Sequence, residues 1–236
     1  MHLANPSFTP PGQLIDSYVA NSNNYSVYKS SLQDPNTLEL VNRLQLFVLI
    51  LIEGGSFIDV SDDRWQIYVL LYPFLPVTLT TRHQKEPNSE VPTIIGYATA
   101  YPYHFHQITS ATSKSEDTAF YDKVFKSSSP TVPTECRLRL SQFIILPPFQ
   151  AAGHGGKFYD TILKNARHDP KVQEISVEDP SDAFEDLRDR RDLAFLEGNK
   201  VFEGIKAPAP KQWVEQTRKQ YKMPPVIMPF LFRLTD

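Results

Sequence analysis

The stretch from Arg137 to Phe158 constrains the fold of this 236-residue chain more than any other. It begins as an apolar strand, Leu138 to Leu146, which ends at Pro147 and Pro148 because proline lacks an N–H donor and fixes φ. A glycine-rich turn follows, and a helical pattern starts near Gly155. Glycines let the backbone approach a ligand, and the first N–H groups of a helix point at negative charge. The sequence therefore predicts a strand, an anion-binding turn and a helix in the middle of the fold.

The turn reads Q-A-A-G-H-G-G from Gln150 to Gly156. It contains neither G-x-x-x-x-G-K-[ST] nor G-x-G-x-x-G, which argues against a P-loop or a dinucleotide fingerprint. What remains is Q-x-x-G-x-G after the strand F-I-I-L-P-P. This resembles the acetyl-CoA loop of the Gcn5-related N-acetyltransferase superfamily, Q/R-x-x-G-x-G/A, and Gln150, Gly153 and Gly155 match it completely. The alternative from the loop alone is a glycine-rich helix start that binds no ligand.

Composition excludes several classes of protein. Hydrophobic residues make up 41% of the chain and aromatic residues 12%, which indicates a packed globular core. A net charge of −3 gives no global basic field for nucleic acid. The single cysteine, Cys136, excludes an internal disulfide framework. No signal-peptide pattern is visible, and the longest apolar run, Leu46 to Ile52, is too short to span a bilayer. We therefore expect neither nucleic acid nor a membrane as a partner.

Periodicity and turn residues predict alternating helices and strands. Asp34 and Pro35 form a cap for a first helix that Gly54 and Gly55 end. A later helix is expected at 183–196, with Asp182 and Glu185 as a capping box. Residues 1–34 look like an extended arm with a short strand at 25–28. The other expected elements are strands at 65–72 (central in the sheet), 93–103 and 172–178, and a helix at 155–167. This order predicts an α/β protein with a mixed sheet.

Two polar or aromatic clusters have ordinary explanations. Tyr97 to Tyr103, with His104 and His106, could form an aromatic binding wall, but strand packing explains the same residues. The two histidines have no third ligand nearby, so no metal site is predicted. The polar runs at 80–90 and 107–134 are expected to be loops.

Three longer blocks resemble the type B histone acetyltransferase catalytic subunits. They are LIEGGSFIDVSDDRWQIYVLLY at 51–72, LSQFIILPPFQAAGHGGKFYDTI at 140–162 and ISVEDPSDAFEDLRDR at 175–190. Their order and spacing fit that family, and APKQWVEQTRKQYKMPP at 209–225 looks like the family's helix beyond the core. The resemblance covers roughly residues 8 to 225, and blocks of this length are specific. It implies a three-layer α/β/α acetyltransferase fold in which two central parallel strands splay apart.

The resemblance also implies a division of the chain. We expect an arm at 1–34 that follows an absent N-terminal domain of about a hundred residues, an acetyltransferase domain at 35–198 and a helical extension at 199–236. After Pro225 the sequence departs from the family's basic and apolar helix. Binding of the histone tail is the property that these departures put in doubt.

Acetyl-CoA is the cosubstrate that the resemblance implies, with no metal. Its pantetheine arm is expected to pair with the backbone of the 143–145 strand, and its pyrophosphate to lie on the N–H groups of the turn. Ser181 and Arg190 match contacts to the adenine end and the neighbouring helix. The cofactor-binding residues expected in this way are Phe143, Ile144, Ile145, Gln150, Ala151, Ala152, Gly153, His154, Gly155, Gly156, Ser181 and Arg190.

Glu178 matches the family's general base, at the end of the strand that neighbours 138–146. Glu53 and Asp179 match the other acidic residues around the reacting lysine and could share or relay the proton. Without the family, Glu178, Asp179 and Pro180 are a strand-end turn, and Glu53 is a solvated helix end. The residues expected to line the groove for the histone tail are Trp65, Tyr101, Pro102 and Tyr103.

The expected function is transfer of an acetyl group from acetyl-CoA to a lysine on the tail of free, newly made histone H4. The family implies a WD40-repeat histone-binding subunit as partner, and the cytoplasm and nucleus as location. Two alternatives remain from the sequence. One is an acetyltransferase for another amine, which leaves the FIDV-x-D-x-x-W block unexplained. The other is a non-catalytic product that binds acetyl-CoA or a histone chaperone.

Overall fold

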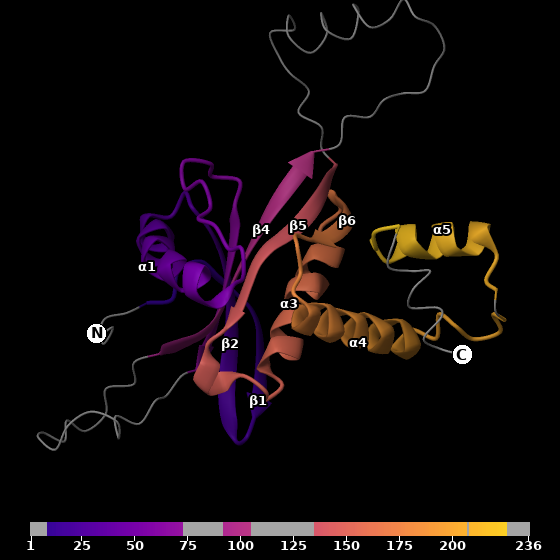
Figure 1. Cartoon of the computed structure of the whole chain (residues 1–236), viewed down its shortest axis with the longest axis horizontal. Coiled ribbons are helices and arrows are strands. Elements are labelled where there is room, and N and C mark those ends of the chain that lie inside the picture. The colour runs from indigo at the N-terminus through magenta and orange to yellow at the C-terminus, as the bar shows by residue number, and fades with distance from the viewer. Residues whose placement is uncertain (1–8, 73–91, 105–134, 207, 226–236) are drawn as a thin grey trace, which may run out of the picture.

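A computed structural model describes residues 9–72, 92–104, 135–206 and 208–225. They form one curled sheet with helices on both faces (Figure 1). The strands are β1 (Gln13–Ala20), β2 (Asn23–Ser31), β3 (Gln66–Tyr72), β4 (Thr93–His104), β5 (Cys136–Ile145) and β6 (Val172–Val177). The helices are α1 (Pro35–Leu51), α3 (His154–His168), α4 (Asp182–Gly198) and α5 (Lys211–Gln220), with a short 3-10 turn, η1, at Pro147–Phe149. The predicted loops at 80–90 and 107–134, His106 and the end of the chain from 226 lie outside the described residues.

The spatial order of the strands is the same as their order in the chain, β1-β2-β3-β4-β5-β6. Neighbours from β1 to β5 are antiparallel, and β5 and β6 are parallel. The mixed sheet and the interior position of β3 are therefore confirmed. Parallel pairing requires a crossover, which α3 provides on its way from β5 to β6.

Residues 13–31 are not an extended arm, because they form the β1–β2 hairpin of the same sheet. Asn21 and Ser22 both have positive φ, +49° and +62°, and join paired residues Ala20 and Asn23. This is the two-residue turn that matches the twist of a hairpin. The short strand expected at 25–28 lies within β2, but the rest of the hairpin resembled an arm because polar residues alternate with the inward-facing ones, of which Tyr25 and Val27 are buried.

Helix α1 covers one face of the sheet. Its N-cap is Asp34, whose carboxylate accepts from Asn36 N, and Pro35 opens the helix as predicted. The buried side chains of Val41 and Val48 pack against Val69 and Ile144. This helix ends beside β5, so residues 51–53 lie close to residues 140–143 of that strand.

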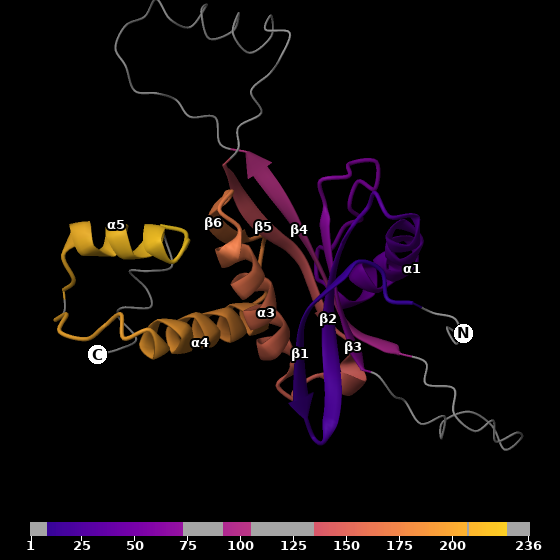
Figure 2. The same ribbon diagram turned by 180° about the vertical axis from the view of Figure 1, so that it is seen from behind.

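Helix α3 covers the opposite face and α4 packs against α3, as Figures 1 and 2 show from the two sides. Phe158, Ile162 and Ala166 of α3 are buried there, which confirms their predicted spacing. Ser181 caps α4 by accepting from Phe184 N, so the predicted cap at Asp182 is wrong by one residue. Asp182 and Glu185 instead place negative charge in the first turn of the helix, where the dipole favours it. The three-layer arrangement is confirmed.

The segment after α5 closes the outer edge of the sheet. Ile175 N on β6 donates to Lys222 O at 2.8 Å, and the Lys222 ammonium donates to the carbonyls of Arg167 and Asp169. Met223 is buried against Leu196 of α4. No helix among the described residues has the length and apolar character needed to cross a membrane.

Candidate active site

Strands β5 and β6 pair over only half of β5. The last residue pair is Leu140 with Val177, and Glu178 N donates to Leu140 O at 2.9 Å. At the next residue, Ser141, β5 bulges against β4, because Leu140 faces Ala100 whereas Gln142 faces Thr99. A bulge bends its strand, and beyond it no described strand pairs with the β6 side of β5. The predicted splay is therefore present.

A cleft of about 700 Å³ opens where the two strands separate. The end of α1 forms one side, residues 140–143 of β5 form the floor, and residues 177–184 form the other side. The cleft is bounded by the carboxyl end of β6, which is where sheets of this class present reactive groups. It is large enough for a small ligand.

The structure places all three predicted carboxylates on this cleft. Glu178 follows β6 directly, Asp179 comes next with φ +35°, and Glu53 lies beyond the end of α1. Three acidic groups from two distant parts of the chain can therefore act on one bound molecule.

Arg139 is a site residue that the sequence interpretation missed. Its Nη2 lies 3.0 Å from Glu178 Oε1, and its guanidinium also donates to the Tyr103 hydroxyl and lies 4.3 Å from that ring's centroid. Both charged side chains are about one third exposed. One feature of the sequence could have indicated this residue. Arg137 and Arg139 alternate with Leu138 and Leu140, so two charged side chains lie on one face of an otherwise apolar strand.

Trp65, Tyr101 and Tyr103 form an aromatic wall that joins the cleft through Arg139. Tyr97, which the sequence also suggested for such a wall, is instead buried in the core. Trp65 and Tyr101 have ring centroids 4.8 Å apart, as do Tyr101 and Tyr103. The Tyr101 hydroxyl donates to Asp62 at 2.6 Å, and burial together with this bond raises the pKa of Tyr101 to about 12. Pro102 projects to the opposite face by strand alternation, so it does not belong to the wall.

Phe143, Ile144 and Ile145 have side chains in the two cores. Phe143 packs against Phe158 and Phe184, with centroids 5.3 and 4.9 Å apart. Ile144 and Ile145 are buried on opposite faces of the sheet. Ile144 and Ile145 therefore offer a ligand only their backbone, whereas the half-buried Phe143 also lines the cleft.

The turn from Gln150 to Gly156 presents backbone rather than side chains. Gln150 Nε2 donates to Ile145 O at 2.7 Å, and Ala151 and Gly153 have φ of +57° and +82°. Ala151, Ala152 and Gly153 are exposed. The N–H groups of Gly155 and Gly156 lie in the first turn of α3, where a helix has no acceptor for them, and no other described residue provides one.

Gly155 allows α3 and α4 to pack closely, in addition to leaving its backbone N–H group open to a ligand. A Cβ atom there would lie 3.0 Å from Leu187 Cδ1 of α4, so glycine lets the two helices approach at the turn. The free N–H groups and the helix dipole suit a phosphate group.

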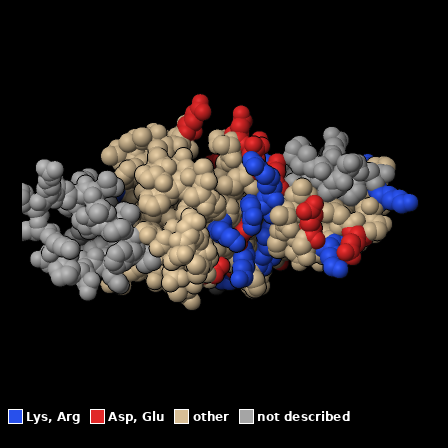
Figure 3. Space-filling model, turned by 90° about the horizontal axis from the view of Figure 1, so that it is seen from below, with Lys and Arg blue, Asp and Glu red and all other residues tan. Residues whose placement is uncertain are grey.

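Ser181 and Arg190 were both expected to contact the adenine end of the cofactor or its neighbouring helix, but only Ser181 lies on the cleft. Ser181 lines the cleft and caps α4. Arg190 is 78% exposed, pairs with Asp186 at 3.4 Å and does not line the cleft. The exposed Lys157 of α3 adds positive charge near the turn, and the exposed Lys164 lies about two helical turns further along the helix. Figure 3 shows Lys and Arg gathered in a band across one face of the molecule.

His154 is also placed differently from the other turn residues. Its imidazole is 3% exposed and points into the fold, where Nδ1 lies 2.9 Å from the Tyr18 hydroxyl. Only its backbone is therefore available for the predicted contact with a ligand. Burial lowers the pKa of His154.

The chain is similar in sequence to a family of histone acetyltransferases. Residues 2–53 match the family model described as histone acetyl transferase HAT1 N-terminus. The chain is 42% identical over 190 residues to the histone acetyltransferase type B catalytic subunit of Yarrowia lipolytica, covering 80% of this chain and 38% of that protein. It is 38% identical over 216 residues to the subunit of the same name from Candida albicans, covering 90% and 46%.

Solved structures overlap the chain loosely. The Eco2 acetyltransferase domain bound to a CoA conjugate has a TM-score of 0.42 at 13% identity and covers 72% of this chain and 87% of that one. An aminoglycoside acetyltransferase from a soil metagenome, in complex with sisomicin, has a TM-score of 0.39 at 11% identity and covers 71% and 86%. The chain spans less than half the length of the curated relatives above. The chain is a homologue of the type B histone acetyltransferase catalytic subunits, over the part of their length that it matches.

Proposed function

We propose that this chain transfers an acetyl group from acetyl-CoA to a lysine in the tail of histone H4, with Glu178 as general base. The observation that carries the proposal is the position of Glu178, at the end of β6 and on the cleft that opens where β5 and β6 separate. The printed names of the relatives, histone acetyltransferase type B catalytic subunits, support the histone as substrate.

The donor set of the site fits acetyl-CoA. The unpaired edge of β5 beyond Ser141 offers backbone groups to the pantetheine amides, and the turn before α3 offers N–H groups to the pyrophosphate. Acetyl-CoA, when bound, supplies an acyl group that is attached to a thiolate leaving group. The groups that would hold it belong to Gln142, Phe143 and the turn from Gln150 to Gly156.

The reaction requires the protein to remove a proton from the substrate's lysine ammonium. Lysine has a reference pKa of about 10.4, so its ammonium must lose a proton before the amine can attack a carbonyl. We assign that proton to the Glu178 carboxylate, which Arg139 holds in place at 3.0 Å. Asp179 and Glu53 line the same cleft and can pass the proton to water. Their negative charge also favours the approach of a lysine-rich peptide.

The test is acetyl transfer to an H4 N-terminal peptide by the wild type and by Glu178→Gln. We expect kcat to fall by roughly 10²–10⁴-fold, the usual contribution of a general base, while the Kd for acetyl-CoA is unchanged. Glu197→Gln, an exposed position at the far end of α4, is the matched control. Full activity in Glu178→Gln would remove the base assignment.

The same experiment decides between the proposal and its alternatives. Acetyl-CoA binding without turnover on any amine would favour a non-catalytic product. Turnover on small amines but not on the peptide would favour a different substrate. We also propose, on the resemblance alone, action on free H4 in the cytoplasm and nucleus together with a WD40-repeat histone-binding subunit, which co-purification with that subunit would test.

A further inference from the structure

The His154 side chain lies in an aromatic cluster outside the cleft. Its ring centroid is 4.4 Å from that of Tyr25 and 6.1 Å from that of Tyr18. Tyr18 and Tyr25 stack on each other at 5.2 Å, and Tyr25 contacts Tyr72 of β3 at the same distance. His154, the first residue of α3, is therefore anchored by residues from the β1–β2 hairpin.

The same cluster holds the other end of the turn. Phe149, the last residue of η1, lies with its ring centroid 6.5 Å from that of Tyr72. The exposed segment between Phe149 and His154 thus has both of its ends fixed to one set of rings. These rings come from β1, β2 and β3, more than 75 residues before the turn in the sequence.

Contacts between the hairpin and α3 continue along the helix. The Thr161 hydroxyl lies 3.2 Å from Asp16 Oδ2 and 2.9 Å from the Lys157 carbonyl of its own helix, and Lys29 Nζ donates to Asn165 Oδ1 at 2.9 Å. With Tyr18 and His154, these bonds link the hairpin to three successive parts of α3. Figure 2 shows β1 running beside α3.

We propose that the β1–β2 hairpin is part of the acetyl-CoA site, where Tyr18 acts as a positioning residue that fixes the turn through its hydrogen bond to His154. The proposal rests on the proposed function, because it assigns the turn to acetyl-CoA. N–H groups bind a phosphate best when they already point at one place, since a mobile loop must be ordered at the moment of binding. The Tyr18 hydroxyl can donate to an unprotonated Nδ1 or accept from a protonated one, according to the His154 tautomer. Burial favours the neutral imidazole.

The test measures direct binding of acetyl-CoA by the whole chain, using calorimetry with the wild type, Tyr18→Phe and His154→Gln. We expect Kd to rise about tenfold in Tyr18→Phe, the size of one lost buried hydrogen bond. In turnover assays the KM for acetyl-CoA should rise while kcat and the KM for the peptide stay the same. Tyr28→Phe removes a hydroxyl from the other face of the same hairpin and should bind like the wild type.

Amide hydrogen exchange separates positioning from a loss of folding. In Tyr18→Phe we expect faster exchange at Gln150 and Lys157, whose N–H groups donate to the carbonyls of Pro147 and Gly153 at the two ends of the turn, with the central amides of β4 unchanged. Unchanged Kd and unchanged exchange at the turn would overturn this proposal and leave the proposed function intact. A wild type that binds no acetyl-CoA would overturn both.

Discussion

At the scale of single residues, Arg139 connects the two halves of the candidate site. It lies on β5 opposite Tyr101 of β4 and Ser176 of β6, and its side chain reaches Tyr103 on one side and Glu178 on the other. One guanidinium can do this because it offers several donors in a fixed plane as well as a flat face for a ring. The orientation of Glu178 is therefore tied to the aromatic wall.

Replacing Arg139 by Gln should lower kcat about tenfold, because the Glu178 carboxylate loses the group that orients it. The effect is expected to be this small because a partly exposed ion pair stabilises by only about 1 kcal/mol. Arg139→Lys should restore part of the rate, since it keeps the charge but not the planar fork. Initial rates on the H4 peptide at saturating acetyl-CoA measure this effect. Arg137→Gln, which changes the same strand two residues earlier, is the control. A raised KM for acetyl-CoA with unchanged kcat would contradict the role.

At the scale of elements, the turn before α3 depends on backbone shape. Gly153 is the N-cap of α3 with φ +82°, a conformation that costs other residues roughly 1–2 kcal/mol. No heavy atom lies within 4 Å of a Cβ added there, so the cost would come from the backbone and not from a clash. The left-handed backbone conformation at residue 153, and not a lack of space for a side chain, therefore favours glycine there.

Gly153→Ala should lower the free energy of unfolding by about 1 kcal/mol and weaken acetyl-CoA binding, because strain relaxes by moving the N–H groups. Gly198→Ala is the matched control, since Gly198 has no neighbour within 4 Å and lies at the end of α4. That change should leave binding unaffected. Urea unfolding and calorimetry of both variants provide the two measurements. Equal binding by Gly153→Ala and the wild type would show that the turn tolerates another backbone conformation.

Elements were predictable from the sequence where a residue type dictates local geometry. Asp34 with Pro35 marked the start of α1, and Pro147 with Pro148 marked the end of β5. Glu178 could be placed at the end of a strand in the same way. The ion pair of Glu178 with Arg139 could not be predicted, because it depends on the register of two strands that are far apart in the chain.

The orientation of His154 was hidden for a related reason. Its neighbours in the sequence are glycines that suggest a ligand, whereas its neighbours in space, Tyr18 and Tyr25, belong to a hairpin read as an arm. Polar residues on the outer face of β1 and β2 made the alternating inward-facing residues of these strands hard to recognise in the sequence. Such tertiary contacts leave no local pattern in the sequence.

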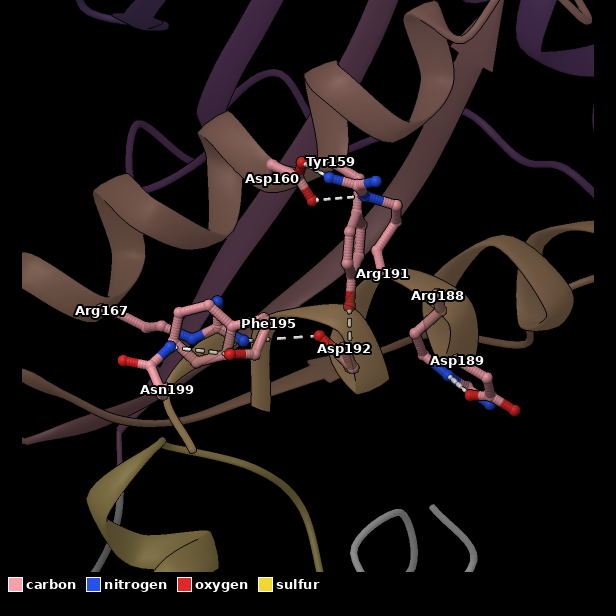
Figure 4. A network of polar contacts seen from close by, with 9 residues as sticks. All are labelled: Tyr159, Asp160, Arg167, Arg188, Asp189, Arg191, Asp192, Phe195 and Asn199. Atoms are coloured by element: carbon pink, nitrogen blue, oxygen red, sulfur yellow. Dashed lines mark hydrogen bonds and ion pairs between the residues drawn. The ribbon is translucent and has the colours of Figure 1, made fainter. Parts of the chain in front are cut away.

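At the scale of the whole molecule, a buried polar network joins α3 to α4 (Figure 4). The Asp192 carboxylate accepts from the Tyr159 hydroxyl at 3.2 Å and from Arg167 at 3.4 Å, and Arg167 lies over the Phe195 ring at 3.8 Å. Arg191 pairs with Asp160 nearby. Burial outweighs the nearby Arg167 and raises the pKa of Asp192 to about 6.

This pKa gives the stability of the molecule a defined dependence on pH. Between about pH 4 and 6 the folded chain keeps the Asp192 proton while the unfolded chain has lost it, so stability contributed by this group falls as pH rises. Asp192→Asn should remove that slope. The stability difference between wild type and variant should shrink by roughly 2–3 kcal/mol from pH 4 to 7, as measured by urea unfolding. A constant difference would mean that Asp192 stays ionised throughout.

The coincidence of strand order with chain order has a consequence for how the molecule is made. During synthesis each strand from β2 to β5 can pair with its predecessor as soon as both have left the ribosome, since N-terminal parts fold first. Strand β6 must wait for the whole of α3, because a parallel partner needs a crossover. A nascent chain therefore contains the turn proposed to bind pyrophosphate before it contains Glu178, the proposed base. The cleft between β5 and the residues after β6 can form only once that later segment has been synthesised.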